Sequence, residues 1–139
     1  METLRGSCLC GAIQYEVPDN FLYAAYCHCS ECRRFSGSAF SALGGLPVNQ
    51  LQIKSGQDSI KYFRKTEESN MAFCERCGSS LFTEKTSKGL IHLRLGTLMD
   101  SPSLKPQAHV LVGSKAPWFE ITDDLPQFEG MPPTVPETS

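Results

Sequence analysis

Seven cysteines in three short clusters constrain this sequence more than any other feature. A CxxC turn can bring two sulfurs onto one tetrahedral metal ion, and the two side chains of a CxC point to the same side of an extended segment. Soft thiolate ligands in a reducing compartment favour zinc, so we expect zinc sites. The clusters are Cys8 with Cys10; Cys27, Cys29 and Cys32; and Cys74 with Cys77.

The number of cysteines indicates two different zinc sites. Four sulfurs complete a tetrahedral structural site, whereas three leave one position open. Seven cysteines therefore divide into four plus three, for two zinc ions per chain. Residues 27–32 supply three ligands locally and are the candidate for the open, reactive site. The closed site, which would join the N-terminal strand to a distant hairpin, would be formed by Cys8, Cys10, Cys74 and Cys77.

Other uses of these cysteines remain open on the sequence alone. Cysteines are often small buried hydrophobic residues, although seven of them in three chelating clusters argue against this. Both CxxC pairs could cross-link in a redox switch, and an all-thiolate set could hold an iron–sulfur cluster. One zinc ion with three spare thiols is a further alternative. A fully paired disulfide framework is excluded because seven is an odd number.

The rest of the composition indicates one globular domain. We expect residues 1–128 to form a single zinc-binding domain and the proline-rich residues 129–139 to be disordered. Thirteen Lys and Arg against fifteen Asp and Glu give a formal charge of −2 without a basic stripe, so nucleic acid is not an expected partner. No secretory leader and no apolar run of about 18 residues is apparent, so we expect no membrane contact and a cytoplasmic location.

Alternating apolar and polar residues predict a mainly β fold with little helix. No segment of ten or more residues has a helical stripe. Residues 33–38 are expected to form a turn, and residues 47–50 one helical turn. The predicted strands, separated by turn signals, are residues 12–17, 21–26, 39–46, 51–54, 59–64, 80–84, 90–95 and 108–112.

Four segments carry the pattern of a known family: GSCLCGAIQYEV (6–17), CHCSECRRFSGSAF (27–40), FCERCGSSLF (73–82) and SKAPWFEITDDLPQFE (114–129). On these segments the sequence resembles the glutathione-dependent formaldehyde-activating enzyme family, which also contains centromere-protein-V-like domains. The resemblance implies a β-tent fold, in which several small antiparallel sheets surround zinc sites. It also implies a structural zinc on Cys8, Cys10, Cys74 and Cys77, and a catalytic zinc on Cys27, Cys29 and Cys32.

An open zinc ion held by three cysteines favours chemistry on sulfur. Three thiolates on one dication leave a net charge of −1, so this zinc is a weaker Lewis acid than one held by three neutral histidines. It can still accept a soft fourth ligand, and a coordinated substrate thiol loses its proton. We therefore expect an enzyme of the carbon–sulfur lyase type that forms or cleaves a thiol–carbonyl adduct. The resemblance implies glutathione and formaldehyde as substrates and S-hydroxymethylglutathione as the adduct.

Several residues near the clusters are candidate helpers, each with a structural alternative. Arg33 and Arg34 follow the CxCxxC directly and could hold a carboxylate of glutathione, or could be solvated surface residues. His28, His109 and Lys115 could contribute to the site or simply pack. Two non-enzymatic functions are also open: a zinc-stabilised binding module, and a thiol redox sensor that uses the three cysteines of the CxCxxC.

Overall fold

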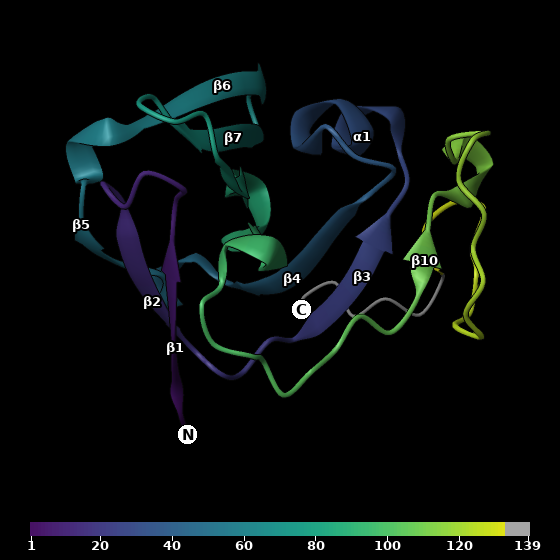
Figure 1. Cartoon of the computed structure of the whole chain (residues 1–139), viewed down its shortest axis with the longest axis horizontal. Helices are drawn as coiled ribbons and strands as arrows, with labels where there is room; N and C mark the ends of the chain where they lie inside the picture. The colour runs from purple at the N-terminus through teal and green to yellow at the C-terminus, as the bar shows by residue number, and fades with distance from the viewer. Residues whose placement is uncertain (133–139) are drawn as a thin grey trace.

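The computed structural model describes residues 1–132 and confirms a mainly β protein with little helix (Figure 1). In this part of the chain, ten strands form a three-stranded and a seven-stranded sheet. The only α-helix among these residues, α1, spans Ser30–Ser36. The strands are β1 (Thr3–Ser7), β2 (Gln14–Pro18), β3 (Tyr23–Cys27), β4 (Ser41–Pro47), β5 (Gln52–Ser55), β6 (Ile60–Thr66), β7 (Ser69–Cys74), β8 (Ser80–Lys85), β9 (Leu90–Arg94) and β10 (His109–Val110).

The smaller sheet has the order β1-β2-β5 and is antiparallel throughout. The alternation expected in residues 12–17 is present in β2, where Tyr15 and Val17 are buried. The strand β1 was not predicted. Only Leu4 marks its buried face as apolar, because the next inward position is Gly6, which lies opposite Tyr15. An alternating pattern that ends in glycine is hard to recognise from sequence.

The larger sheet has the order β10-β3-β4-β9-β8-β7-β6. Its pairs are antiparallel except for β10 with β3, which is parallel, so this sheet is mixed rather than purely antiparallel. Strand β9 shows that the two faces of this sheet differ. Ile91 and Leu93 are fully buried in the core on one face, while His92 and Arg94 point to the opposite face. Both faces of the sheet are therefore covered near its centre.

The buried apolar residues form two clusters, and each cluster contains cysteines of one group only. The main core joins both sheets and includes Cys8 and Cys74. A smaller cluster lies between β3, β4 and β10 and is built on Cys27, Leu43 and Val110. The two groups of cysteines therefore lie in different parts of the fold.

Helix α1 occupies most of the segment that was predicted as a turn. With seven residues it is too short to show a helical stripe. Its ends are nevertheless marked: the thiol of Cys29 caps the first turn by accepting a hydrogen bond from the Cys32 N–H, and Gly37 ends the helix in the left-handed conformation with φ of 66°. The single helical turn expected at residues 47–50 is confirmed as a 3-10 turn at Val48–Gln50.

The chain beyond β10 returns along its side. The amide of His109 donates to the carbonyl of Pro126, and that of Phe128 donates to the carbonyl of His109. Of the predicted tail, Glu129 and Gly130 are hydrogen-bonded to residues 111–113, whereas residues 133–139 lie outside the described residues. No helix in residues 1–132 has the length and apolar character needed to cross a membrane.

The close approach of β1 and β2 predicts a specific cost for Gly6→Ala. A Cβ atom at this position would overlap the ring of Tyr15. We expect the substitution to lower the free energy of unfolding by about 1–3 kcal/mol, as measured by urea denaturation. Gly96→Ala is the matched control, because a Cβ atom there meets nothing within 4 Å. Equal effects of the two substitutions would contradict the packing described for β1.

Candidate metal centres

The structure brings the seven cysteines together in the two groups derived from the sequence. Within each group, all sulfur atoms lie within 4.8 Å of one another. All seven cysteines are free thiols. The shortest recorded separation, 3.6 Å between Sγ of Cys8 and Sγ of Cys10, is far longer than a disulfide bond of about 2.05 Å. The groups are Cys8, Cys10, Cys74 and Cys77, and Cys27, Cys29 and Cys32.

The four-cysteine group has the dimensions of a tetrahedral metal site. In a tetrahedral zinc site with Zn–S bonds of about 2.3 Å, adjacent sulfurs are about 3.8 Å apart. The Sγ atoms of Cys8 and Cys10 are 3.6 Å apart, and those of Cys10 and Cys74 are 3.9 Å apart. The residues present therefore fit a metal ion with four sulfur ligands.

Backbone amides support the sulfurs of this group. The N–H of Ile13 donates to Sγ of Cys8, and the N–H of Arg76 donates to Sγ of Cys74, both at 3.3 Å. Gly78, with φ of 78°, turns the chain back after the CxxC. Such N–H donors stabilise the deprotonated form of a thiol, which is the form that binds metal.

The three-cysteine group lies at the junction of β3 and α1. Cys27 is the last residue of β3, and Cys29 and Cys32 belong to the cap and first turn of α1. The N–H of Cys32 donates to Sγ of Cys29 at 3.2 Å. Hydrogen bonds from the neighbouring thiols of Cys27 and Cys32 lower the pKa of Cys29, and the same proximity raises the pKa of Cys32. The group can supply three sulfur ligands and leaves one position of a tetrahedron to another ligand.

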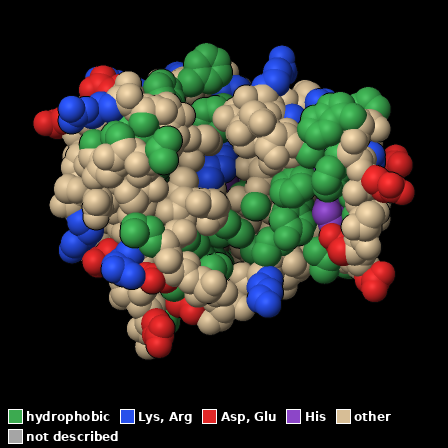
Figure 2. Space-filling model, in the orientation of Figure 1, with side chains coloured by type: hydrophobic (Ala, Val, Ile, Leu, Met, Phe, Trp, Pro, Cys, Tyr) green, Lys and Arg blue, Asp and Glu red, His purple; other side chains and the backbone are tan. Residues whose placement is uncertain are grey.

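A cavity of about 900 Å³ adjoins the three-cysteine group. All three cysteines line it, together with the face of the large sheet that points away from the main core. Figure 2 shows the molecule hollowed near its middle, with basic side chains in the depth of the hollow. The charged residues that line the cavity are four cations, Lys65, Lys85, Lys88 and Arg94, and two carboxylates, Glu31 and Glu68.

Arg94 is the most deeply placed of these cations, with 6% of its surface exposed. Its guanidinium donates to the carbonyl of His92 at 3.0 Å and to Oγ1 of Thr83 at 2.7 Å, and it lies 5.1 Å from the ring centre of Phe35 on α1. Burial lowers the pKa of Arg94, while the nearby cysteines, led by Cys32, oppose this shift. Within residues 1–132, Arg94 has no carboxylate partner.

Tyr23 and His92 form a hydrogen-bonded pair on the cavity wall. Register places Tyr23, Gly45 and His92 in one row across β3, β4 and β9. A side chain at Gly45 would overlap the Tyr23 ring, so glycine allows this ring to cross β4 and hydrogen-bond to Nε2 of His92 at 2.7 Å. Burial lowers the pKa of His92 to about 3, so this imidazole is neutral at physiological pH.

The arginines singled out in the sequence lie elsewhere. Neither Arg33 nor Arg34 is among the residues that line the cavity. Arg34 is exposed and its Nε donates to the carbonyl of Ser30, while Arg33 is half-buried. Their role in substrate binding stays a prediction. Lys115 donates to the carbonyls of Ala116 and Phe119 and lines a separate, smaller cavity.

The cavity cations Arg94 and Lys85 and the pair of Tyr23 with His92 were not identified from the sequence. The alternation in residues 90–95 places His92 and Arg94 on the face opposite Ile91 and Leu93, but it gives no sign that this face is enclosed.

Fold and site together define a class: a mainly β protein with one four-sulfur and one three-sulfur centre. The chain belongs to the glutathione-dependent formaldehyde-activating enzyme family, whose model matches residues 3–114. This confirms the resemblance inferred from the sequence segments.

Individual relatives are distant. A Halomonas elongata protein, provisionally named a glutathione-dependent formaldehyde-activating enzyme, is 27% identical over 127 residues, which cover 85% of this chain and 80% of the relative. An Aspergillus flavus protein of the same name is 27% identical over 77 residues, which cover 54% of this chain and only 40% of that protein. A crystal structure of a Rhodobacter sphaeroides protein aligns with a TM-score of 0.59 and 22% identity, over 71% of this chain and 91% of that one, and shows a shared fold.

The positions of the two centres predict different consequences of losing a sulfur. Cys74 is fully buried in the main core, and its sulfur lies 3.9 Å from that of Cys10 in the connection between β1 and β2. Cys74→Ser should therefore remove one bound metal ion and about 3 kcal/mol or more of unfolding free energy. Cys32→Ser should remove the other metal ion and leave the fold intact, because its group is local in sequence. Elemental analysis and thermal unfolding of both variants check this. A larger loss of stability in Cys32→Ser would contradict the assignment.

Proposed function

We propose that the protein is a zinc enzyme of the carbon–sulfur lyase type that forms or cleaves an adduct between a small anionic thiol and an aldehyde. Glutathione and formaldehyde are the substrates that the family name supports. The observation that carries the proposal is the three-cysteine group, which has a coordination position to spare and adjoins a cavity rich in cations. The residues that would hold the reactive zinc are Cys27, Cys29 and Cys32, and those that would hold the structural zinc are Cys8, Cys10, Cys74 and Cys77.

The donor sets support zinc as the ion in both groups. Both consist of sulfur alone, which is typical of zinc. When bound to the three-cysteine group, zinc would lower the pKa of an incoming thiol and hold it as a nucleophilic thiolate.

The cavity is large enough for a tripeptide thiol, since ligand sites of drug-sized molecules are about 300–1,000 Å³. Arg94 pairs through Leu43 with Ala25, two residues before Cys27 on β3. Two strand spacings of about 4.8 Å and two residues of about 3.4 Å along β3 place the Cα atoms of Arg94 and Cys27 roughly 12 Å apart, a distance that the long Arg94 side chain and a tripeptide could span together. Arg94 and Lys85 are therefore suited to binding carboxylates of the thiol substrate.

The reaction itself requires no oxidant or reductant. The sulfur of the thiol forms a bond with the carbonyl carbon, the π pair of the C=O bond moves to oxygen, and a proton equivalent to the one lost by the thiol ends on that oxygen. Cleavage is the reverse of these steps. The apolar residues Leu43, Val110 and Phe128 line the cavity beside the cysteines and would limit the access of water.

The first prediction concerns activity. Zinc-loaded protein mixed with glutathione and formaldehyde should exchange free and adduct forms faster than the spontaneous rate, as measured by NMR exchange spectroscopy. Cys32→Ser should remove the acceleration while the protein stays folded, because the open centre loses a ligand. Metal-free protein without added zinc, and an equal amount of free zinc without protein, are the controls. No acceleration with several different thiols would instead favour a zinc-stabilised binding module.

A second prediction concerns charge. S-methylglutathione, which has a blocked sulfur, should bind at least about tenfold more tightly than its dimethyl ester, which corresponds to about 1.4 kcal/mol. Arg94→Gln and Lys85→Gln should each reduce this preference, as measured by calorimetry. Lys61→Gln is the matched control, because Lys61 is exposed on β6, pairs with Glu75 and does not line the cavity. A preference that survives both cavity substitutions would exclude a carboxylate-binding role for these cations.

A further inference from the structure

A chain of hydrogen-bonded side chains lies directly behind the three-cysteine group. Nε2 of His28 is 2.8 Å from Nδ1 of His109, and Nε2 of His109 is 2.9 Å from Oδ2 of Asp123. The two imidazoles are 0% and 2% exposed, whereas the Asp123 carboxylate is 45% exposed. These hydrogen bonds therefore connect the surface carboxylate of Asp123, in the segment after β10, to His28, the residue between Cys27 and Cys29.

The carboxylate sets the direction of the first hydrogen bond in this row of side chains. Asp123 can only accept, so Nε2 of His109 donates to it. The other ring nitrogen of His109, Nδ1, is hydrogen-bonded to Nε2 of His28. Each ring is consequently held in one orientation by a partner on the next residue of the row.

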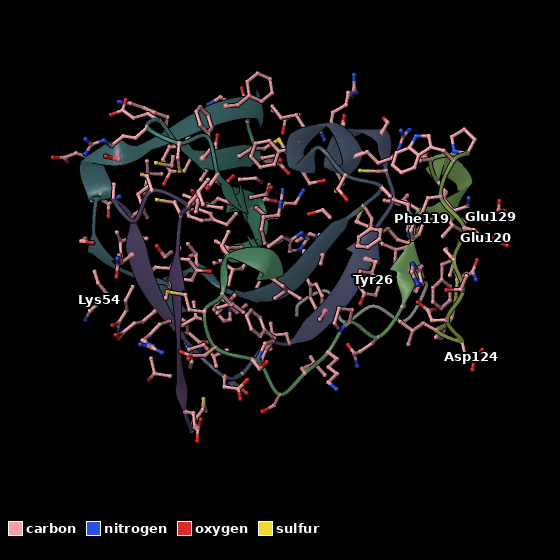
Figure 3. The ribbon with its side chains drawn as sticks, in the orientation of Figure 1. Tyr26, Lys54, Phe119, Glu120, Asp124 and Glu129 are labelled. Atoms are coloured by element: carbon pink, nitrogen blue, oxygen red, sulfur yellow. The ribbon has the colours of Figure 1, made fainter. Side chains whose placement is uncertain are left out.

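Aromatic rings enclose the chain. The ring of His28 has its centre 5.4 Å from that of Phe40 and 6.1 Å from that of Phe119, and Tyr26 lies 4.9 Å from His109. Figure 3 shows Tyr26 and Phe119 between β3 and the C-terminal segment, next to β10. Exclusion of water by these rings strengthens the hydrogen bonds of the chain.

The backbone of His28 is also hydrogen-bonded. Its N–H donates to the carbonyl of Val110 at 3.0 Å, which continues the pairing of β3 with β10. Because Cys27 and Cys29 flank His28 in the sequence, fixing this one residue from behind restricts the positions of both sulfurs.

We propose that His109 and Asp123 are positioning residues for the three-cysteine group and act through His28. This inference rests on the proposed metal-binding role of that group. All three ligands come from one short segment, so no distant part of the chain tethers the group through a sulfur, unlike the four-cysteine group. Order in this segment must come from other contacts, and partners of this kind commonly change metal affinity by about 10–100-fold. Asp123 lies beyond residues 3–114, which the family model matches.

The test compares the metal affinity of the two centres in Asp123→Ala. The wild-type chain and Cys32→Ser are titrated with a zinc chelator, and the zinc released is measured. The release phase that is missing in Cys32→Ser belongs to the three-cysteine group. In Asp123→Ala this phase should show at least about tenfold weaker binding, and the other phase should not change. Asp123→Glu should restore part of the affinity. The matched control is Asp124→Ala, which removes an exposed carboxylate from the neighbouring residue.

A spectroscopic readout separates positioning from general stability. In the wild-type chain, ¹⁵N NMR of the imidazoles should show His109 protonated at Nε2, with or without metal, because this nitrogen donates to Asp123, and Asp123→Ala should disturb this pattern. Equal weakening of both centres, or a loss of thermal stability with unchanged affinity of the three-cysteine group, would overturn the proposal. A wild-type chain that takes up only one zinc ion would instead refute the proposed role of the three-cysteine group itself.

Discussion

The convergence of four thiols from two distant turns is the contact on which the rest of the structure depends. Cys8 and Cys10 follow the first strand of the small sheet, whereas Cys74 ends β7 of the large sheet and Cys77 lies in the turn that leads to β8. Their sulfurs meet at the edge of the main core, which joins the two sheets. A shared metal ion there would fix the relative position of both sheets more strongly than the apolar contacts alone, because ligands separated by long chain segments carry much of the folding free energy.

The two faces of the large sheet carry different groups of residues: one face packs into the main core, and the other lines the cavity beside the three-cysteine group. In β9 the residues Ile91 and Leu93 complete the core, while His92 and Arg94 face the cavity. The three-cysteine group needs no part of the main core, because its sulfurs lie in a smaller apolar cluster with Leu43 and Val110. Substitutions in the cavity can therefore change the site without removing the contacts that hold the sheets together.

Local sequence patterns predicted most strands and both cysteine groups, whereas features that depend on pairing between distant segments could not be predicted. The grouping of the cysteines followed from their spacing, and most strands followed from alternation. Strand β1 was missed because Gly6 occupies one of its inward positions, and α1 because it is only seven residues long. The position of Arg94 on the cavity wall depends on its register against Leu43 across the sheet, which no local pattern encodes. The same applies to the contact between His28 and His109, which are 81 residues apart.

The chain as a whole is slightly acidic, but the cavity wall contains a buried cation. The chain has a formal charge of −2, yet Arg94 is buried with only neutral hydrogen-bond partners in the described part of the protein. Burying an unpaired cation costs several kcal/mol unless an opposite charge compensates it. The three cysteines, led by Cys32, oppose the lowering of the Arg94 pKa by burial, and three thiolates together with a dication would carry −1. In the proposed metal-bound state, the deprotonated sulfurs would therefore stabilise the buried guanidinium, so the charge state of the centre and the stability of the cavity wall would be coupled.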